Sequence, residues 1–202
     1  METVVIFADI SGFTNLSEAC AKKDYGNEEL AFCINRYMEG MVTNLNQYGG
    51  DIIKFVGDAM IVMWPPVEAD DQRNDTIRRA ILCSIEIQRN MNNLQILPGT
   101  TLSVKIGIGY GKCGILYVGG VYNRSETLTV GEALTQALKS EGMSGGGGDV
   151  VIAEPCFKHV AEYFRATELI NEETHEKFFK VNLRSSISKS VKIQADSMKM
   201  RQ

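Results

Sequence analysis

The sequence predicts an α+β (α/β sandwich) fold built around one mixed β-sheet flanked by helices. Apolar runs of strand length alternate irregularly with segments of helical period, and hairpin signals lie between several of the strand runs. No internal repeat is visible in the chain. The length of 202 residues suits one large domain that buries a substantial core.

The first strand and the first long helix are defined by their apolar spacing. Thr3–Ala8 is apolar and rich in β-branched side chains, which predicts a central strand that is covered on both faces. A long helix is expected to begin at Gly26 or Asn27 and to end at Gly49-Gly50. Its buried stripe is predicted to comprise Leu30, Ile34, Tyr37, Met38, Met41 and Leu45.

Turn signals and proline organise the rest of the chain. Residues 51–64 predict a hairpin that turns at Gly57-Asp58 and is stopped by Pro65-Pro66. The polar stretch Glu68–Asp75 is expected to lead into a helix. The sequence further predicts paired strands over Leu102–Gly111 and Gly114–Val118, a helix over Val130–Lys139, a loop at Ser144–Gly148, a strand over Asp149–Ala153, a short helix begun by Glu154-Pro155, and strands near Phe164–Leu169 and Lys177–Val181.

Composition and charge exclude several classes of protein. A net charge of −4, with 44% hydrophobic and 23% charged residues, is typical of a soluble globular domain. No basic patch of the kind that binds nucleic acid stands out, and the basic segment Lys189–Arg201 is interpreted as a solvated tail. No apolar run approaches the ~20 residues of a membrane span. No signal peptide precedes the first strand, so a cytoplasmic protein is expected.

The cysteines favour a reducing compartment. The chain has five of them, and their spacing fits neither a disulfide framework nor a zinc site. We therefore expect buried free thiols at Cys20, Cys33, Cys83, Cys113 and Cys156.

Two aspartates are candidates for a metal site. Asp9 ends an apolar strand, and Asp58 lies in the Gly-Asp turn of the predicted hairpin. If the two strands are neighbours in one sheet, the carboxylates converge. Two hard carboxylates beside a turn rich in backbone amides suit a magnesium–nucleotide site. The alternative is that each aspartate only caps a turn.

The turn after Asp9 is a candidate phosphate cradle. The cradle would comprise Ser11, Gly12, Phe13 and Thr14. Gly12 allows close approach of the backbone to a phosphate, and the helix that follows presents its N-terminus to it. The alternative is a helix-capping turn with Ser11 or Thr14 as the cap. Both interpretations can hold at once.

Lys54 and a series of glycines complete the motifs. Lys54 lies four residues before Asp58, on the same face of the strand if no bulge intervenes; the alternative is a snorkelling edge lysine. The glycines have the wrong spacing for a dinucleotide loop and run within strands, so they predict bulges or close backbone approach. They are Gly107, Gly109, Gly111 and Gly114.

Four blocks of the chain resemble the class III nucleotidyl cyclases, most closely the first catalytic half of the soluble adenylyl cyclases. They are Phe7–Thr14, Gly49–Ala59, Val104–Gly111 and Thr129–Ala133, in the family's order. The resemblance implies a ferredoxin-like core with an added hairpin arm. It also implies a catalytic domain over residues 1–183, with residues 184–202 as a C-terminal extension or linker.

The resemblance also implies roles for individual residues. Asp9 and Asp58 would hold two Mg²⁺ ions, for which Mn²⁺ could substitute, with the backbone carbonyl of Ile10 as a further ligand. The nucleotide phosphates would contact Ser11, Gly12, Phe13, Thr14 and Gly57. Lys54 and Thr129 would belong either to the base-binding site or to its degenerate twin, where bicarbonate binds in soluble cyclases.

The departures from the family pattern fall on one half of such a site. Thr135 and Lys139 stand where the family has a ribose-positioning asparagine and a transition-state arginine, and Leu128 stands at the base-selecting position. Two further expected arginines are missing, because Ser103 occupies the place of one that contacts triphosphate and Leu138 that of one that binds bicarbonate. Arg124 is a candidate substitute from a loop.

The resemblance therefore implies the metal-binding half of a two-part adenylyl cyclase. Such a domain would convert ATP to cyclic AMP and pyrophosphate only when paired with a second cyclase domain. The alternative is a non-catalytic nucleotide-binding or scaffolding module with the same fold.

Overall fold

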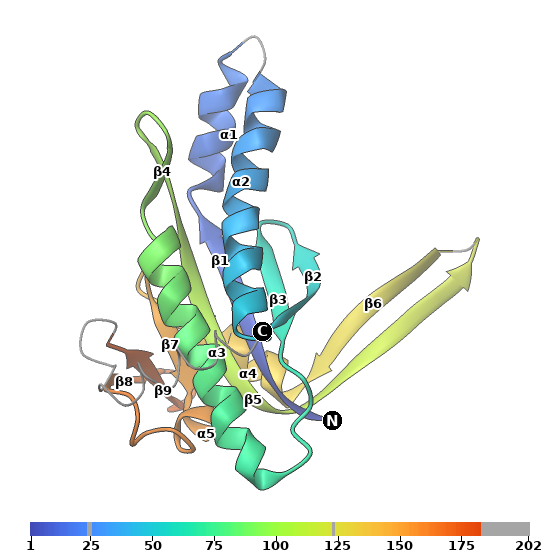
Figure 1. Ribbon diagram of the computed structural model, residues 1–202, viewed down its shortest axis with the longest axis vertical. Helices are drawn as coiled ribbons and strands as arrows, with labels where there is room; N and C mark the ends of the chain where they lie inside the picture. Colours follow the sequence, from blue (N-terminus) through green and yellow to red (C-terminus); the bar gives the residue numbers. More distant parts are fainter. Residues whose placement is uncertain (24–25, 123, 183–202) are drawn as a thin grey trace.

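Figure 1 shows a computed structural model of the chain, which describes residues 1–23, 26–122 and 124–182. The sheet runs in the order β2-β3-β1-β5-β7-β9-β8, with β4 and β6 paired to β5 outside that path. Its β5–β7 pair is parallel and its other pairs are antiparallel, which confirms the predicted mixed sheet. The elements are β1 (Glu2–Ser11), α1 (Phe13–Ala21), α2 (Gly26–Gln47), β2 (Asp51–Val56), β3 (Ala59–Met63), α3 (Asp70–Met91), β4 (Leu94–Leu97), β5 (Thr100–Val121), β6 (Arg124–Gly131), α4 (Glu132–Gly142), β7 (Val150–Ala153), α5 (Glu154–Phe157), β8 (Ala166–Ile170) and β9 (Lys177–Val181).

The central strand β1 separates two hydrophobic cores. Val4 and Ile6 on one face join the larger core, into which α1, α2 and α3 pack. Val5 on the opposite face joins a smaller core with Ala133 and Ala137 of α4. In α2, Tyr37, Met41 and Leu45 are buried and Leu30, Ile34 and Met38 are partly buried against the larger core, so the predicted stripe is confirmed.

The prediction of two paired strands over Leu102–Gly111 and Gly114–Val118 is wrong, because both segments belong to the continuous strand β5. The first part of β5 pairs with β1 up to Lys112, and the rest pairs with β6 from Cys113 onward. The two patterns in the sequence therefore reflect a change of partner rather than a turn. The outer part of β5 and β6 form a two-stranded arm that projects from the body (Figure 1).

Two glycines of β5 let α4 approach the sheet closely. A Cβ atom built at Gly107 would lie 2.0 Å from the carbonyl oxygen of Ala137, and one at Gly109 would lie 2.2 Å from that of Ala133. No side chain fits in that space. The interpretation of this glycine series as structural is therefore confirmed at these positions.

Two helix boundaries differ from the prediction. Helix α3 begins at Asp70, inside the stretch expected to be a polar lead-in, because polar residues in the first turns of a helix can face solvent. Helix α4 begins at Glu132 rather than Val130, because the preceding residues pair with β5 as β6. The hairpin turning at Gly57-Asp58 is confirmed.

Three further observations concern predictions about the whole chain. The cysteines are buried and free, as expected. In the part of the chain that the structure describes, no helix is long and apolar enough to cross a membrane. The predicted boundary after residue 183 and the segment Lys189–Arg201 lie outside the described residues.

Candidate active site

Strand pairing brings Asp9 and Asp58 to the same end of the sheet. Asp9 on β1 lies opposite Ala59 on β3, and Asp58 is the residue directly before Ala59. Gly57 adopts a φ of +65°, which a glycine at the first position of a tight hairpin turn tolerates without strain. Both aspartates are half-buried. The two strands are neighbours in the sheet, which is the condition under which the two carboxylates are expected to converge.

A lysine occupies the space beside Asp9. Lys105 on β5 lies opposite Asp9 in the register, and its Nζ is 3.1 Å from Asp9 Oδ2. The same Nζ is 2.6 Å from Glu141 Oε1, near the end of α4. The hydrogen bond to Glu141, followed by that to Asp9, raises the pKa of Lys105 above its ordinary value. The Lys105 ammonium group is therefore paired with the carboxylate of Asp9, a metal ligand predicted from the sequence.

The turn after Asp9 leaves backbone amides available at the start of α1. Gly12 is the N-cap residue, with a φ of +99°, and no side chain caps the helix there. The first amides of a helix have no acceptor within the helix, so those of Phe13 and Thr14 can meet an anion. A Cβ at Gly12 would lie 2.5 Å from the carbonyl oxygen of Thr101, so glycine is required. The alternative of Ser11 or Thr14 as the cap is wrong.

Lys54 is tied to the arm of its own chain. Its Nζ lies 2.9 Å from Glu126 Oε2 and 3.2 Å from the carbonyl oxygen of Thr127. The expectation that strand alternation relates Lys54 to Asp58 is wrong, because β2 ends at Val56 and Asp58 lies in the turn beyond it.

Register nevertheless puts Lys54 on the same face of the sheet as Asp9. Lys54 and Phe7 are both opposite Ile61, and Asp9 follows Phe7 by two residues on β1. Thr129 lies on the neighbouring arm, where its buried Oγ1 has no hydrogen-bond partner.

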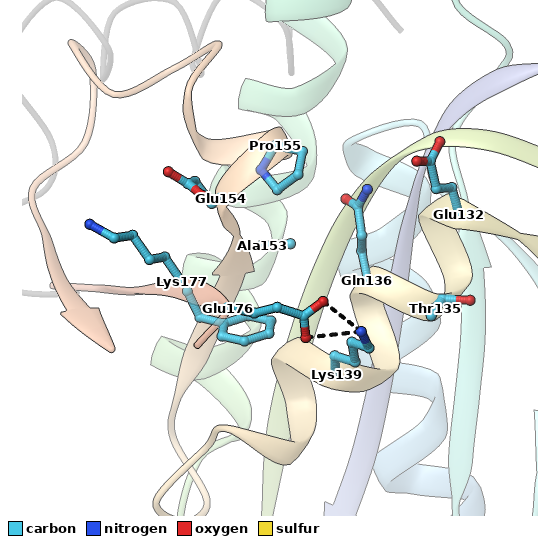
Figure 2. Close-up of a pocket in the computed structure, with 10 residues that line it drawn as sticks. Glu132, Thr135, Gln136, Lys139, Ala153, Glu154, Pro155, Glu176 and Lys177 are labelled. Carbon is cyan, nitrogen blue, oxygen red and sulfur yellow. Dashed lines mark hydrogen bonds and ion pairs between the residues drawn. The ribbon is translucent and has the colours of Figure 1, made fainter. Parts of the chain in front are cut away.

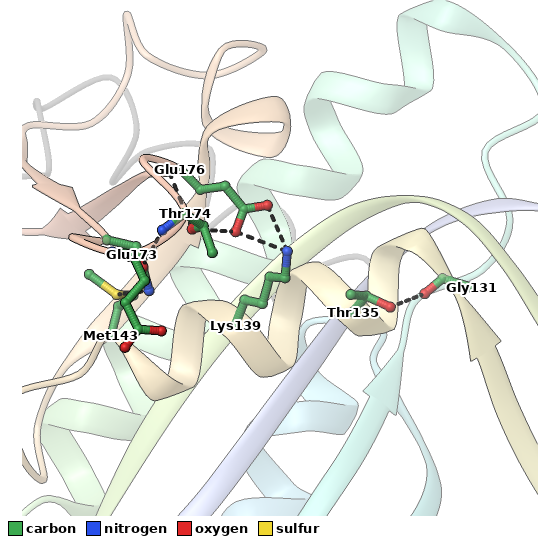
Figure 3. Close-up of polar contacts among 8 residues, drawn as sticks. Gly131, Thr135, Lys139, Met143, Glu173, Thr174 and Glu176 are labelled. Carbon is green, nitrogen blue, oxygen red and sulfur yellow. Dashed lines mark hydrogen bonds and ion pairs between the residues drawn. The ribbon is translucent and has the colours of Figure 1, made fainter.

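Two polar side chains of helix α4, Thr135 and Lys139, already have partners within the chain. Lys139 Nζ contacts both carboxylate oxygens of Glu176, at 2.6 and 2.9 Å, as Figure 2 shows. This contact holds the pKa of the Glu176 carboxyl below its usual value. Thr135 donates a hydrogen bond to the carbonyl oxygen of Gly131 at 3.1 Å (Figure 3). The pair Lys139–Glu176 lies at the edge of a hollow of about 300 Å³ between α4, α5 and β9.

The other departures noted in the sequence are spread over the fold. Ser103 donates a hydrogen bond to Asn93 Oδ1, and Arg124 begins β6, opposite the last residue of β5 and therefore at the outer end of the arm. The structure therefore does not support Arg124 as a substitute arginine within this chain. Leu128 and Leu138 are 44% and 43% exposed.

Comparison with known sequences identifies the family. The sequence model of the adenylate and guanylate cyclase catalytic domain matches residues 1–161. The chain belongs to this family. Adenylate cyclase type 10 of Oryctolagus cuniculus is 33% identical over 158 residues, which are 77% of this chain and 10% of that protein. An adenylate cyclase of Anabaena cylindrica is 26% identical over 162 residues, 78% of this chain and 30% of that protein.

Solved cyclase structures have the same fold. The adenylyl cyclase CyaB from P. aeruginosa superposes with a TM-score of 0.73 at 22% identity, over 93% of this chain and 97% of that one. The guanylate cyclase domain of RhGC from Catenaria anguillulae, in complex with GTP, superposes with a TM-score of 0.74 at 18% identity, over 90% and 96%. The predicted cyclase fold is confirmed. This cyclase domain spans a tenth of the length of the type 10 relative.

The donors that this cyclase domain presents at Asp9 suit magnesium. One half-buried carboxylate, Asp9, lies on β1 and the other, Asp58, lies in the turn before the neighbouring strand β3, and Asp9 already accepts the Lys105 ammonium as a stand-in cation. Within the described residues, no cluster of three or more histidine, cysteine, aspartate or glutamate side chains could hold a metal. The remaining ligands would be the carbonyl oxygen of Ile10, water and substrate phosphates, as is common for Mg²⁺.

Lys105 and Glu141 were not among the site residues predicted from the sequence. The available signal for Lys105 was its place in a block that resembles the family, two residues before Gly107. Its position opposite Asp9 depends on the register between β1 and β5, which the sequence alone does not reveal.

Proposed function

We propose that this domain is the metal-binding half of an adenylyl cyclase that converts ATP to 3′,5′-cyclic AMP and pyrophosphate together with a complementary cyclase domain. The observation that carries the proposal is a difference between the candidate metal-binding residues and the residues on α4. Asp9 is opposite Ala59, the residue after Asp58, and is followed by the uncapped start of α1, whereas Lys139 is paired with Glu176. The relatives of highest identity that we report are adenylate cyclases, which favours ATP over GTP.

The proposed roles follow from the position of each residue. Asp9, Asp58 and the carbonyl oxygen of Ile10 would hold two Mg²⁺ ions, or Mn²⁺ in their place. Bound there, such ions neutralise the triphosphate and lower the pKa of the ribose 3′-hydroxyl. The amides of Phe13 and Thr14, and the turns at Ser11-Gly12 and Gly57, would orient the phosphates.

Lys105, Lys54 and Thr129 would act around this centre. Lys105 adds a positive charge beside Asp9, where the phosphates would lie. Lys54 and Thr129 would line either the base pocket or its twin, on the face of the sheet that carries Asp9. At the twin site we expect weak bicarbonate binding, because Leu138 presents apolar surface where a second cation is needed.

A complementary domain would cover the apolar surface that the fold leaves open. Phe55 and Val56, at the end of β2 next to the Gly57 turn, are 50% and 46% exposed. On the arm, the exposed fractions of Tyr117 and Val118 are 80% and 50%. Exposed apolar surface of this kind marks protein interaction sites.

A second candidate is a non-catalytic module that binds Mg–ATP without turnover. The observation that favours it is that polar side chains of α4 already have partners: Thr135 donates a hydrogen bond to the carbonyl oxygen of Gly131, and Lys139 is held by Glu176. Loss of a single preorganised transition-state donor typically lowers the rate by ~10²–10³. In this candidate no partner would supply the missing groups.

Cyclic AMP formation separates the two candidates. The domain is assayed with Mg–ATP, alone and mixed with a cyclase domain that carries asparagine and arginine at the two α4 positions. We expect negligible product from the domain alone and clear turnover from the mixture. ATP binding without turnover in every mixture would favour the second candidate. Robust activity of the domain alone would refute the division into halves.

A further inference from the structure

The contacts around Lys105 join two carboxylates of different elements through one cation. In the antiparallel pair β1–β5, residues opposite each other point to the same face, so Lys105 meets Asp9 directly. Its Nζ is 3.1 Å from Asp9 and 2.6 Å from Glu141. The side chains of Asp9, Lys105 and Glu141 are 28%, 26% and 14% exposed.

Glu141 is the firmer of the two partners. It makes the shorter ion pair and is the more buried carboxylate, and its contact is the largest influence on the raised pKa of Lys105. Its backbone also lies close against β5, because a Cβ at Gly107 would lie 2.4 Å from the Glu141 nitrogen. This packing holds the end of α4 beside Lys105. Lys105 can leave Asp9 and still keep a full counter-charge.

The Lys105–Asp9 contact and the Lys105–Glu141 contact have opposite effects on metal binding at Asp9. The Lys105 ammonium occupies an acceptor position of Asp9 Oδ2 and repels a divalent cation at the same carboxylate, so the Lys105–Asp9 contact competes with metal binding. A change that strengthens the Lys105–Asp9 contact should lower the metal affinity, and a change that removes it should leave the Asp9 carboxylate free to bind a metal. The Lys105–Glu141 contact acts in the opposite direction, because it draws the ammonium away from Asp9.

We propose that Lys105 is the internal counter-ion of Asp9 and that Glu141 is a positioning residue that takes over Lys105 when a metal binds. The inference rests on the proposed metal role of Asp9. Without a metal, Lys105 neutralises the charge of Asp9. When a metal binds to Asp9, Lys105 stays paired with Glu141 beside the site, where its positive charge can contact the phosphates. Glu141 thus sets the metal affinity of the site without contacting the metal.

The test measures Mn²⁺ binding to the whole chain in the absence of nucleotide, from the loss of the free-ion electron paramagnetic resonance signal. Lys105→Met should raise the affinity for Mn²⁺ about three- to fivefold, the effect of one partly exposed charge pair. Glu141→Gln should lower the affinity about threefold, because Lys105 then has Asp9 as its remaining partner. Lys105→Arg keeps the charge and should leave the affinity near that of the unchanged protein.

The double variant Lys105→Met/Glu141→Gln carries the decisive comparison. It should match Lys105→Met alone, because Glu141 acts only through Lys105. Matched controls are Lys112→Met at the opposite end of the β1–β5 pairing and Glu132→Gln at the start of α4, which should leave the affinity unchanged. Thermal unfolding checks that each variant is folded.

Two results would overturn the inference. The first is a Mn²⁺ affinity of Lys105→Met that is unchanged or lower, and the second is an effect of Glu141→Gln that persists without Lys105. Asp9→Asn tests the underlying metal site separately. If Asp9→Asn binds Mn²⁺ as the unchanged protein does, the metal role of Asp9 is wrong, and the inference is wrong with it.

Discussion

Asp9 and Asp58 have the same chemistry but different structural settings. Asp9 lies within a central strand and is paired with Lys105, so changing it alters an ion pair as well as the candidate metal site. Asp58 lies in a turn between two strands, outside their pairing. Asp58 is therefore the residue at which metal binding can be tested with the least effect on the fold.

Asp58→Asn should lower the affinity for Mn²⁺–ATP about tenfold or more, because even groups behind metal ligands change affinity by that amount. Stability should change by less than about 0.5 kcal/mol, as is usual for a substitution outside the core. Calorimetric titration and thermal unfolding measure the two effects. Asp51→Asn, which removes the same charge from the exposed start of the same hairpin, is the matched control. Equal affinities of the two variants would contradict the metal role of Asp58.

At the scale of elements, the contact between α4 and β5 determines where the site can form. Helix α4 carries Glu141 at one end and Thr135 and Lys139 along its length, and all three positions depend on how closely the helix meets the sheet. Gly107 and Gly109 permit that closeness because their missing side chains leave the helix backbone in contact with the strand. These glycines therefore affect the site although neither has a functional group.

Gly109→Ala should destabilise the domain by about 2 kcal/mol or more, because its methyl group would enter space already filled by the α4 backbone. Gly114→Ala is the control on the same strand. Its Cβ would have its nearest contact 3.7 Å away, at Val130, so its effect should stay within about 0.5 kcal/mol. Urea unfolding of both variants makes the comparison. Equal stability of the two would show that α4 does not rest on Gly109.

In the molecule as a whole, the arm and the body have different roles. The body contains the hydrophobic cores, whereas the arm pairs only β5 with β6 and exposes large apolar side chains. Two paired strands without a core behind them gain little stability of their own. The arm is therefore expected to contribute to association with a partner more than to the stability of the domain.

Tyr117→Ser, at a side chain that is 80% exposed, should leave the stability of the domain within about 0.5 kcal/mol. It should weaken association with a complementary cyclase domain about tenfold, as expected for the loss of an interfacial aromatic residue. Sedimentation equilibrium of the mixture measures the association. Phe32→Ser on α2, 67% exposed, is the control and should leave association unchanged. Similar effects of both variants would argue against the arm as the interface.

The buried cysteines give the whole domain a dependence on alkaline pH. Burial raises the pKa of the Cys83 and Cys156 thiols above their ordinary value of 9.0. Above about pH 9 the unfolded chain loses these protons while the folded chain keeps them, so stability falls as pH rises. The urea midpoint should decrease between about pH 8 and pH 10, less steeply in Cys156→Ala. A midpoint that does not change over this range would contradict the argument.

Local signals in the sequence were sufficient for the candidate metal residues. The Gly57-Asp58 turn is encoded by adjacent residues, because a glycine between two apolar runs is enough to favour a hairpin. The apolar run before Asp9 likewise predicts a strand by itself. These features depend on period and turn chemistry within a few residues, so they could be predicted without a structure.

Which distant residues meet could not be predicted from the sequence and became known from the fold. The contact of Lys105 with Asp9 depends on the register of two strands far apart in the chain, and the neutralisation of Lys139 depends on a turn that brings Glu176 beside α4. The continuity of β5 was hidden for the same reason, because its two halves take their patterns from different partners. Register and strand partnership are set by the packing of all elements together, and no local pattern contains that information.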